Sequence, residues 1–207
     1  MIFDPLKEGK RETYFKMIET ILPRPIAWVS TVSSEGTRNL APFSFFTGVT
    51  STPPTLLFCC GNKRGGIPKD TAQNCIDTGE FVVNVVVGAQ CEEMVVTSAA
   101  LDAHVDEFEA AGLDAIDSHL IGVPRVKGAP ISFECTCREI IEIKDDQGRI
   151  TSRIIIGNIL LIHIDDGVLA EDGTVDTDRL DIVGRIGGQS YAKLAQPFVV
   201  ERPKRPG

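Results

Sequence analysis

The stretch Arg24-Pro25-Ile26-Ala27-Trp28-Val29-Ser30-Thr31, followed by Asn39-Leu40-Ala41-Pro42-Phe43-Ser44-Phe45-Phe46, decides how this chain folds. The first part is typical of a β-strand, and Gly36 marks the turn that follows it. The second part mixes small, hydroxyl, amide and aromatic side chains, which an ordinary core strand does not need. Such a surface suits a flat heterocycle that is stacked on one face and hydrogen-bonded along its edge.

Three further blocks follow in order along the chain. They are Lys69–Asn74 with Thr78–Val85, Asp106–Leu113, and Val183–Tyr191. Together with the first stretch, these blocks resemble the flavin reductase-like family of FMN-binding split barrels, in particular its flavoredoxin-type branch. The likeness covers roughly residues 20–202. It implies a mainly β fold, namely a split β-barrel with Greek-key-like connections and a few short peripheral helices, in a single FMN-binding domain spanning residues 1–207.

Composition agrees with this expectation and excludes other classes of protein. A length of 207 residues corresponds to one large domain, and a hydrophobic fraction of 43% supports a packed core. The formal net charge of −8 argues against a nucleic-acid-binding protein, because phosphate neutralisation needs clustered Lys and Arg. No apolar run approaches the ~18 residues that span a bilayer. The segment Met1–Glu8 carries acids where a signal peptide would be basic and then apolar. We therefore expect a cytoplasmic protein, without membrane or nucleic-acid partners, whose six cysteines are reduced.

Period-two patterns predict long strands. Along residues 131–143, the apolar side chains alternate with polar ones and share one side; they are Ile131, Phe133, Cys135, Cys137, Ile141 and Ile143. A turn at Asp145–Gly148 then returns the chain as a partner strand over residues 149–165. This return strand and Phe81–Val87 are apolar on both faces, so they need cover outside the barrel as well as inside. Helices or a second subunit could provide that cover, and the family resemblance implies a homodimer.

Helical signals are short. We expect helices over residues 70–78 with Gly79 as the cap, about 91–100, about 104–111 before Gly112, and 189–195 before Pro197. The polar, Pro-rich tail of residues 201–207 is expected to pack loosely.

A phosphate group needs positive charge and free backbone N–H groups. The glycine-rich loop Gly61–Gly66 contains Lys63 and leads to Lys69 and Thr71, where a helix begins whose first N–H groups have no internal partners. The family pattern implies that Lys69, Thr71 and Asn74 contact the phosphate. The alternative interpretation is a solvated glycine loop with an ordinary Thr or Asp cap.

The edge of a flavin ring needs donors near N5 and near the N1–C2 carbonyl, where negative charge collects on reduction. The matching block implies five contacts to this edge, which are Asn39, Ala41, Pro42, Phe43 and Ser44. Ser30 and Thr31 end the preceding strand, and we expect them to face the same cavity. The alternatives are strand-end hydrogen bonding for Ser30 and Thr31, and a turn-closing role for Asn39.

Several aromatic side chains are available for the plane of the ring. They are Trp28, Phe43, Phe45, Phe46 and Tyr191. Aromatic residues belong to the core more often than to cofactor sites, and Trp28 is better interpreted as structural. Tyr191 follows a glycine-rich turn, which favours a ligand-facing position. Arg185 in the same block could reach the cofactor or an anionic substrate.

Two polar residues interrupt apolar strands, and each needs a hydrogen-bond partner if it is buried. Asn84 is best interpreted as a satisfied core residue. His163, followed by Asp165 and Asp166, resembles the family's His-x-Asp-Asp segment, so a place near the active site stays open beside a structural role. No residue is assigned as catalytic beyond this. The cysteines form no Cys-x-x-Cys pair with a nearby His, so we expect no metal site and interpret all six as structural.

The function that follows is redox chemistry on a flavin. No G-x-G-x-x-G or Walker sequence is present, so a nicotinamide donor would bind against the flavin itself. We expect non-covalently bound FMN and an NAD(P)H-dependent flavin reductase, which could supply reduced flavin to a partner monooxygenase. The alternative is a flavoredoxin-like electron carrier with permanently bound FMN and no nicotinamide-dependent turnover. A flavin-binding module without a redox role is a third interpretation.

Overall fold

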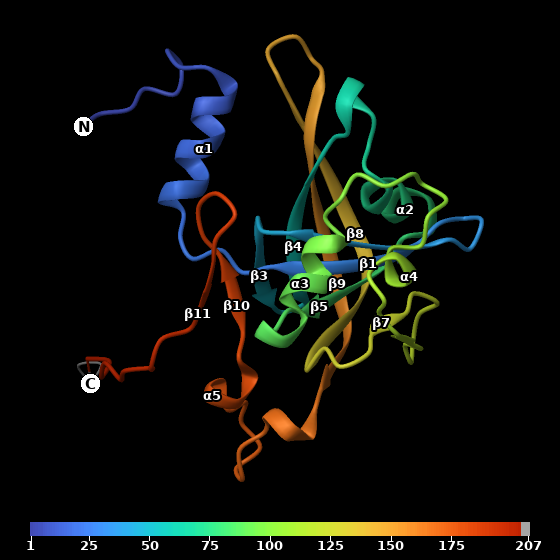
Figure 1. Ribbon diagram of the computed structural model, residues 1–207, viewed down its shortest axis with the longest axis vertical. Coiled ribbons are helices and arrows are strands. Elements are labelled where there is room, and N and C mark those ends of the chain that lie inside the picture. The colour runs from blue at the N-terminus through green and yellow to red at the C-terminus, as the bar shows by residue number, and fades with distance from the viewer. Residues whose placement is uncertain (204–207) are drawn as a thin grey trace.

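Seven strands form one antiparallel sheet in the order β2-β1-β5-β8-β9-β4-β3 (Figure 1). The computed structural model describes residues 1–203, so residues 204–207 of the expected loose tail lie outside the described residues. The strands of this sheet are β1 (Ala27–Val32), β2 (Arg38–Phe43), β3 (Phe46–Ser51), β4 (Pro54–Gly61), β5 (Glu80–Val85), β8 (Ile131–Lys144) and β9 (Ile150–Ile164). The predicted mainly β fold is confirmed.

Short elements surround the sheet. Two small hairpins pair β6 (Ala115–Ile116) with β7 (Arg125–Val126), and β10 (Val183–Arg185) with β11 (Tyr191–Lys193). The helices are α1 (Lys10–Thr20), α2 (Asp70–Thr78), α3 (Cys91–Val96), α4 (Glu107–Ala110) and α5 (Thr177–Leu180). Single 3₁₀ turns lie at η1 (Arg64–Gly66), η2 (Gly88–Gln90) and η3 (Asp166–Val168). Among these described helices, none is both long and apolar enough to cross a membrane.

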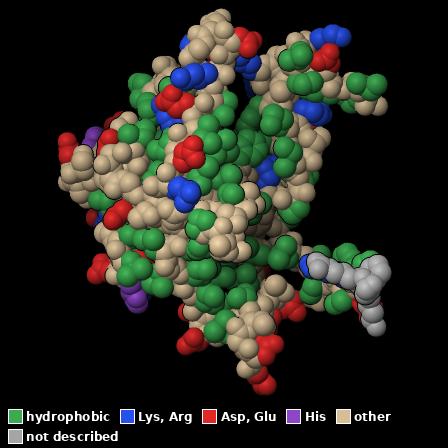
Figure 2. All heavy atoms as spheres, turned by 180° about the vertical axis from the view of Figure 1, so that it is seen from behind, with side chains coloured by type: hydrophobic (Ala, Val, Ile, Leu, Met, Phe, Trp, Pro, Cys, Tyr) green, Lys and Arg blue, Asp and Glu red, His purple; other side chains and the backbone are tan. Residues whose placement is uncertain are grey.

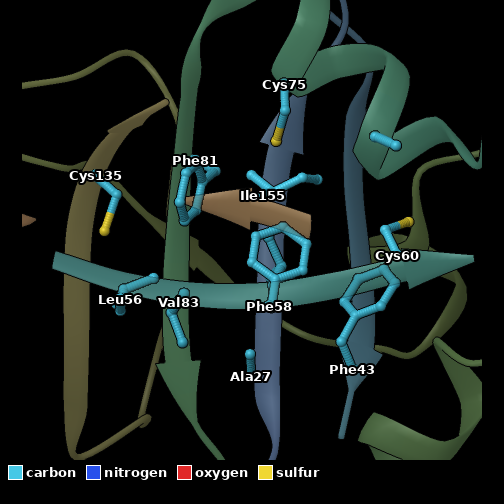
Figure 3. Packing of buried hydrophobic residues seen from close by; sticks show 12 residues of the cluster. Ala27, Phe43, Leu56, Phe58, Cys60, Cys75, Phe81, Val83, Cys135 and Ile155 are labelled. Atoms are coloured by element: carbon cyan, nitrogen blue, oxygen red, sulfur yellow. The ribbon is translucent and has the colours of Figure 1, made fainter. Parts of the chain in front are cut away.

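The sheet curls until strands from its two ends meet inside. Phe43 of β2 and Phe58 of β4 lie with ring centroids 5.1 Å apart, and Phe58 meets Phe81 of β5 at 5.4 Å (Figure 3). Because β2 and β4 stand near opposite ends of the strand order, this contact closes the barrel interior. Gly157 of β9 faces the Phe81 ring so closely that a Cβ there would overlap it. The sheet therefore wraps around one aromatic core.

The helix predictions have mixed outcomes. Helix α2 and its cap are confirmed, with Gly79 at φ 71°. Helices α3 and α4 are shorter than expected, and the predicted helix over residues 189–195 is wrong. There, Gly188 adopts a positive φ of 59° and turns the chain back, so that Tyr191 pairs with Arg185 in a hairpin. Helix α1 was not predicted, because only Ile18 on it is buried and no apolar stripe shows in its sequence.

The predicted hairpin of β8 and β9 is confirmed, with the Asp145 N–H donating to the Arg149 carbonyl at 3.0 Å. The expected shared face along β8 is wrong beyond Cys137. A register shift between Cys137 and Glu139 exchanges the two sides of the strand, so Ile140 packs on the core. Ile141 and Ile143 are consequently 39% and 42% exposed.

The expected cover outside the barrel comes from the chain itself for one of the two strands. Residues 81–85 of β5 are all buried within the chain, so this strand needs no second subunit. On β9, Leu160, Ile162 and Ile164 remain 41%, 48% and 40% exposed. Figure 2 shows apolar side chains on the back of the molecule, including the hollow beside α1.

Candidate functional site

A first cleft opens between β2, the start of α2, the segment after α3, and α4. It encloses about 590 Å³ of empty space, part of it open to solvent. Six residues predicted from the sequence line it, namely Asn39, Ala41, Pro42, Lys63, Lys69 and Thr71. The sequence blocks from β2, the glycine loop and α2 therefore meet at one place, as the family resemblance implied.

The start of α2 carries no side-chain cap. Lys69 occupies the N-cap position without a side-chain hydrogen bond, so the interpretation of Thr71 or Asp70 as an ordinary cap is wrong. The first N–H groups of a helix have no internal acceptor, and the helix dipole places partial positive charge there. Lys63 approaches from the glycine loop, where its ammonium lies 2.7 Å from the Asp70 carboxylate. This end of the cleft is therefore suited to an anion.

A buried amide network stands behind the cleft. The Asn39 side-chain amide donates to the hydroxyl oxygens of Thr31 at 3.1 Å and Thr71 at 3.0 Å. The Asn74 amide donates to the same Thr31 oxygen at 2.9 Å. Because the Thr71 oxygen accepts from Asn39, its own hydrogen stays available for a ligand. Thr31 and Asn74 are not in the lining of the cleft, so they position Asn39 and Thr71.

Lys69 and Phe43 form a stacked pair at the border of the cleft. The Lys69 ammonium lies 5.6 Å from the centroid of the Phe43 ring. The Phe43 ring is only 6% exposed and packs on Phe58 inside the barrel. Phe43 is therefore a core residue and does not line the first cleft. Lys69 makes no salt bridge within residues 1–203, which leaves its charge available.

A second cleft adjoins the first, because Pro42 and Ser98 line both. It contains three more of the predicted residues, which are Ser44, Arg185 and Tyr191. Its outer wall is formed by Tyr14, Phe15 and Ile18 of α1, which the sequence did not identify. A polar, cationic cleft thus continues into one with aromatic walls.

Arg185 and Tyr191 face each other across the β10–β11 hairpin. The guanidinium carbon lies 4.5 Å from the ring centroid, and Arg185 donates to the Tyr191 oxygen and, at 2.5 Å, to the Gly188 carbonyl. Burial raises the pKa of the Tyr191 hydroxyl, so it stays protonated at neutral pH. Since its oxygen already accepts from Arg185, the hydroxyl hydrogen is free to donate into the second cleft.

Arg24 connects α1 to the barrel beneath this cleft. Its side chain is 3% exposed and donates to the carbonyls of Ile18 at 2.5 Å, Ile21 at 2.9 Å and Ile186 at 3.1 Å. Its Nε lies 3.3 Å from the Ser44 hydroxyl. Burial lowers the pKa of this guanidinium below its usual range. Arg24 begins the stretch that decides the fold, yet nothing local indicated this role.

Four predicted positions lie outside both clefts, and Ser30 has the clearest reason. Its hydroxyl donates to the Pro124 carbonyl at 2.6 Å, on the side of β1 opposite to Thr31. The expectation that both face one cavity is wrong, because neighbouring residues on a strand point to opposite faces. The other three positions are Thr31, Phe43 and Asn74.

Trp28 and Asn84 are core residues with satisfied polar groups, as expected. Trp28 is fully buried and its Nε1 donates to the Thr97 hydroxyl at 2.9 Å. Asn84 donates to the Trp28 carbonyl at 3.0 Å and accepts from the Ser132 hydroxyl at 2.9 Å.

His163 lines neither of the two clefts, and its hydrogen-bond partner lies elsewhere. Its Nε2 lies 2.6 Å from Glu134, a fully buried carboxylate that also accepts the N–H groups of His119 and Leu120 at 2.7 Å each. Burial raises the pKa of Glu134, but these hydrogen bonds outweigh it and hold the pKa below its usual range. His163 therefore has the buried partner that its strand position required.

The cysteines are free thiols of two kinds. Cys60, Cys75 and Cys135 are buried, whereas Cys59, Cys91 and Cys137 are half-buried, so the burial implied by a structural role is complete for three of the six. Burial raises the pKa of the Cys60 thiol to about 11, which leaves it unreactive at neutral pH.

Sequence reasoning missed one charged residue in the first cleft. Glu107, at the start of α4, is 6% exposed, and its carboxylate accepts the Leu40 N–H at 3.2 Å. Burial, together with the nearby carboxylates of Asp70 and Asp106, raises its pKa to about 7. Glu107 lies in the third sequence block, but no spacing rule placed it opposite Lys69. The segment Thr97–Leu101 after α3 was missed in the same way.

Comparison with known proteins shows similarity along nearly the whole chain. The family model described as "Flavin reductase like domain" matches residues 19–180. The chain is 39% identical over 203 residues to the uncharacterized protein YwrF of Bacillus subtilis, covering 98% of each chain. Among solved structures it is similar to nitrilotriacetate monooxygenase component B from Bacillus cereus, with 31% identity, a TM-score of 0.92, and 97% and 98% of the two chains covered.

A second solved structure is similar to nearly the same extent. The 2-nitrobenzoate 2-nitroreductase NbaA of Pseudomonas fluorescens has 28% identity, a TM-score of 0.87, and coverage of 99% of this chain and 98% of its own. The family model covers most of the chain, and its range of residues 19–180 includes the first three sequence blocks. This protein belongs to the flavin reductase-like family.

Proposed function

We propose that the protein binds FMN non-covalently across the two adjoining clefts and works as an NAD(P)H-dependent flavin reductase. The observation that carries this proposal is the continuity of the clefts at Pro42 and Ser98. One end offers an uncapped helix start with lysines, and the other offers aromatic walls. FMN has the same two parts, a phosphate and a flat ring.

The residues of the first cleft have groups suited to a phosphate. Lys69 supplies a charge that no carboxylate among the described residues pairs with, and Thr71 supplies a hydroxyl hydrogen that its own network does not use. The free N–H groups of α2 add donors. Lys63 contributes less, because Asp70 already neutralises it. Asn39 acts by fixing the Thr71 rotamer.

Ala41, Pro42 and Ser44 lie where the two clefts join, so in this proposal they contact the ring edge. When bound, FMN supplies the hydride acceptor and donor chemistry that the side chains of this chain lack. The protein's part is to orient the ring and leave one face accessible. Tyr191 can hold its hydroxyl proton towards the second cleft, and Arg185 presents positive charge there.

The nicotinamide donor is proposed to bind in the second cleft against the ring. The support is the absence of a separate dinucleotide fingerprint in the sequence and the position of Arg185 beside the aromatic wall. A partner monooxygenase as the acceptor of reduced flavin is supported by the name of the similar Bacillus cereus protein, a monooxygenase component. The electron-carrier alternative predicts bound FMN without nicotinamide turnover.

A homodimer is part of the same proposal. Leu160, Ile162 and Ile164 form an apolar row on β9 that residues 1–203 leave partly exposed. A two-fold pair can bury one such row against its own copy. A single domain spanning residues 1–207 and a cytoplasmic location stay predictions.

The experiment is a titration of the purified protein with FMN, FAD and riboflavin, followed by addition of NADH or NADPH. We expect about one FMN per subunit, preferred over FAD, and nicotinamide oxidation that depends on flavin. A protein that leaves FMN fluorescence unchanged would refute the binding site. Bound FMN that no nicotinamide reduces would instead favour the electron carrier.

A further inference from the structure

The first cleft contains a buried acid where an anion is expected to bind. The Glu107 side chain is only 6% exposed, and it lines the same cleft as Lys69 and Thr71. In the described part of the chain it forms no salt bridge. The nearby cation Arg38 is engaged elsewhere, with Asp106 at 2.5 Å and Glu109 at 3.4 Å.

Within residues 1–203, the one hydrogen-bond partner of Glu107 from another residue is the Leu40 N–H, at 3.2 Å from Oε2. This bond satisfies a backbone donor on edge strand β2, so it is a structural role. A carboxyl group has two oxygens, and the protonated form also carries a donor hydrogen. The Leu40 bond therefore leaves one oxygen, and any proton on it, available to the cleft.

The charges around Glu107 favour its protonated form when a phosphate arrives. Two cations, Lys63 and Lys69, and two acids, Asp70 and Glu107, line the cleft. With Glu107 ionised the lining is electrically neutral, whereas with Glu107 protonated it carries one net positive charge. A phosphate monoester carries a charge of about −1.5 to −2 at neutral pH. It therefore binds better to the protonated cleft.

We propose that Glu107 binds the flavin phosphate as a neutral carboxylic acid, donating a hydrogen bond, so that FMN and one proton bind together. This inference rests on the proposed FMN site and adds a recognition residue to it. The proton comes from solvent and stays on the Glu107 carboxyl, so no covalent bond to the flavin forms or breaks.

Proton linkage gives the size of the effect. Burial, Asp70 and Asp106 raise the pKa of Glu107 to about 7 in the free protein. If bound phosphate holds the proton throughout, FMN affinity is constant well below that pKa and falls as pH rises above it. Between about pH 6 and pH 8.5 the FMN dissociation constant then increases about 30-fold from this group. Riboflavin, which lacks the phosphate, should not show this dependence.

The test compares wild type with Glu107→Gln by FMN fluorescence quenching across that pH range. Gln keeps an oxygen for the Leu40 N–H and an N–H₂ donor for the phosphate, but it does not titrate. We expect the ratio of the two dissociation constants to change about 30-fold with pH, since titration of the phosphate itself is common to both. Glu109→Gln, on the exposed side of α4, is the matched control and should follow wild type.

A second measurement needs no variant. Calorimetry of wild type with FMN at about pH 7.5, in buffers of different ionisation enthalpy, should show uptake of more than half a proton, and none with riboflavin. Parallel pH curves for wild type and Glu107→Gln, or FMN binding without proton uptake, would overturn the proposal while the FMN site stands. Absence of FMN binding by wild type at every pH would overturn both.

Discussion

Replacing Arg24 with Met should release α1 while the barrel stays folded. Arg24 donates two hydrogen bonds to the C-terminal end of this helix, to the carbonyl of Ile18 in its last turn and to that of its C-cap residue Ile21. A hydrogen bond from a charged donor contributes about 1.5–3 kcal/mol, so the variant loses roughly 3–6 kcal/mol of attachment. Met fills similar volume without the donors.

Little else holds the helix in place. Ile18 is its one buried side chain, and its burial contributes about 2 kcal/mol. The helix has 11 residues, fewer than the ~12–15 at which even good isolated helices become marginally stable. The barrel has its own aromatic core, to which Arg24 does not belong. Loss of Arg24 should therefore act locally.

Hydrogen exchange followed by mass spectrometry measures this directly. A loss of about 3 kcal/mol corresponds to at least about 100-fold faster exchange of the α1 amides, with β4, β5 and β9 unchanged. Arg11→Met is the control, because Arg11 lies on the surface of α1 and stacks on Phe15 at 5.6 Å. Unchanged exchange in α1 of the Arg24 variant would refute the reasoning. Global unfolding would show that Arg24 also stabilises the barrel.

Two further predictions follow from the clefts and the apolar row. Lys69→Ala and Thr71→Ala should each weaken FMN binding about 10- to 150-fold in a fluorescence titration, because each removes a charge-assisted hydrogen bond of roughly 1.5–3 kcal/mol, whereas Lys127→Ala, on the surface beside Asp114, should not. Unchanged curves for both variants would place the phosphate elsewhere. Light scattering should give twice the chain mass of 22.5 kDa, and Ile162→Glu should shift it towards one chain. A wild-type mass near that of one chain would refute the dimer.

Local signals were enough to find residues that line the cationic end of the first cleft. A lysine before a helix start and a glycine after its end are properties of the nearby sequence, and α2 with Gly79 follows them. Local signals could not show which neighbouring side chains point to the same side of a strand. Ser30 and Thr31 are adjacent, yet Thr31 joins the Asn39 network while Ser30 bonds to Pro124. That outcome depends on strand register rather than on residue type.

Glu134 shows that alternation along a strand does not by itself decide which side chains are buried. Alternation places Glu134 on the polar side of residues 131–143, but the fold buries it completely and gives it His163 as partner. The loop at His119 and Leu120 supplies the remaining donors. A buried carboxylate is tolerable only with such partners, and no part of the strand sequence announces a loop that lies about 15 residues away.

The second cleft was the hardest part to predict because its walls come from distant segments of the chain. Arg24 donates a hydrogen bond to the carbonyl of Ile186, 162 residues later in the chain. Helix α1 covers the second cleft with side chains that are mostly exposed. A helix that buries one residue has no periodic apolar pattern in its sequence. The position of α1 therefore depends on its hydrogen bonds to the Arg24 guanidinium. One buried side chain and the Arg24 hydrogen bonds attach α1 to the barrel. We therefore expect that α1 can be released without disturbing the barrel. Arg24 itself lines the second cleft and donates a hydrogen bond to Ile18 in its wall, so we expect replacement of Arg24 to change access to the aromatic side chains there.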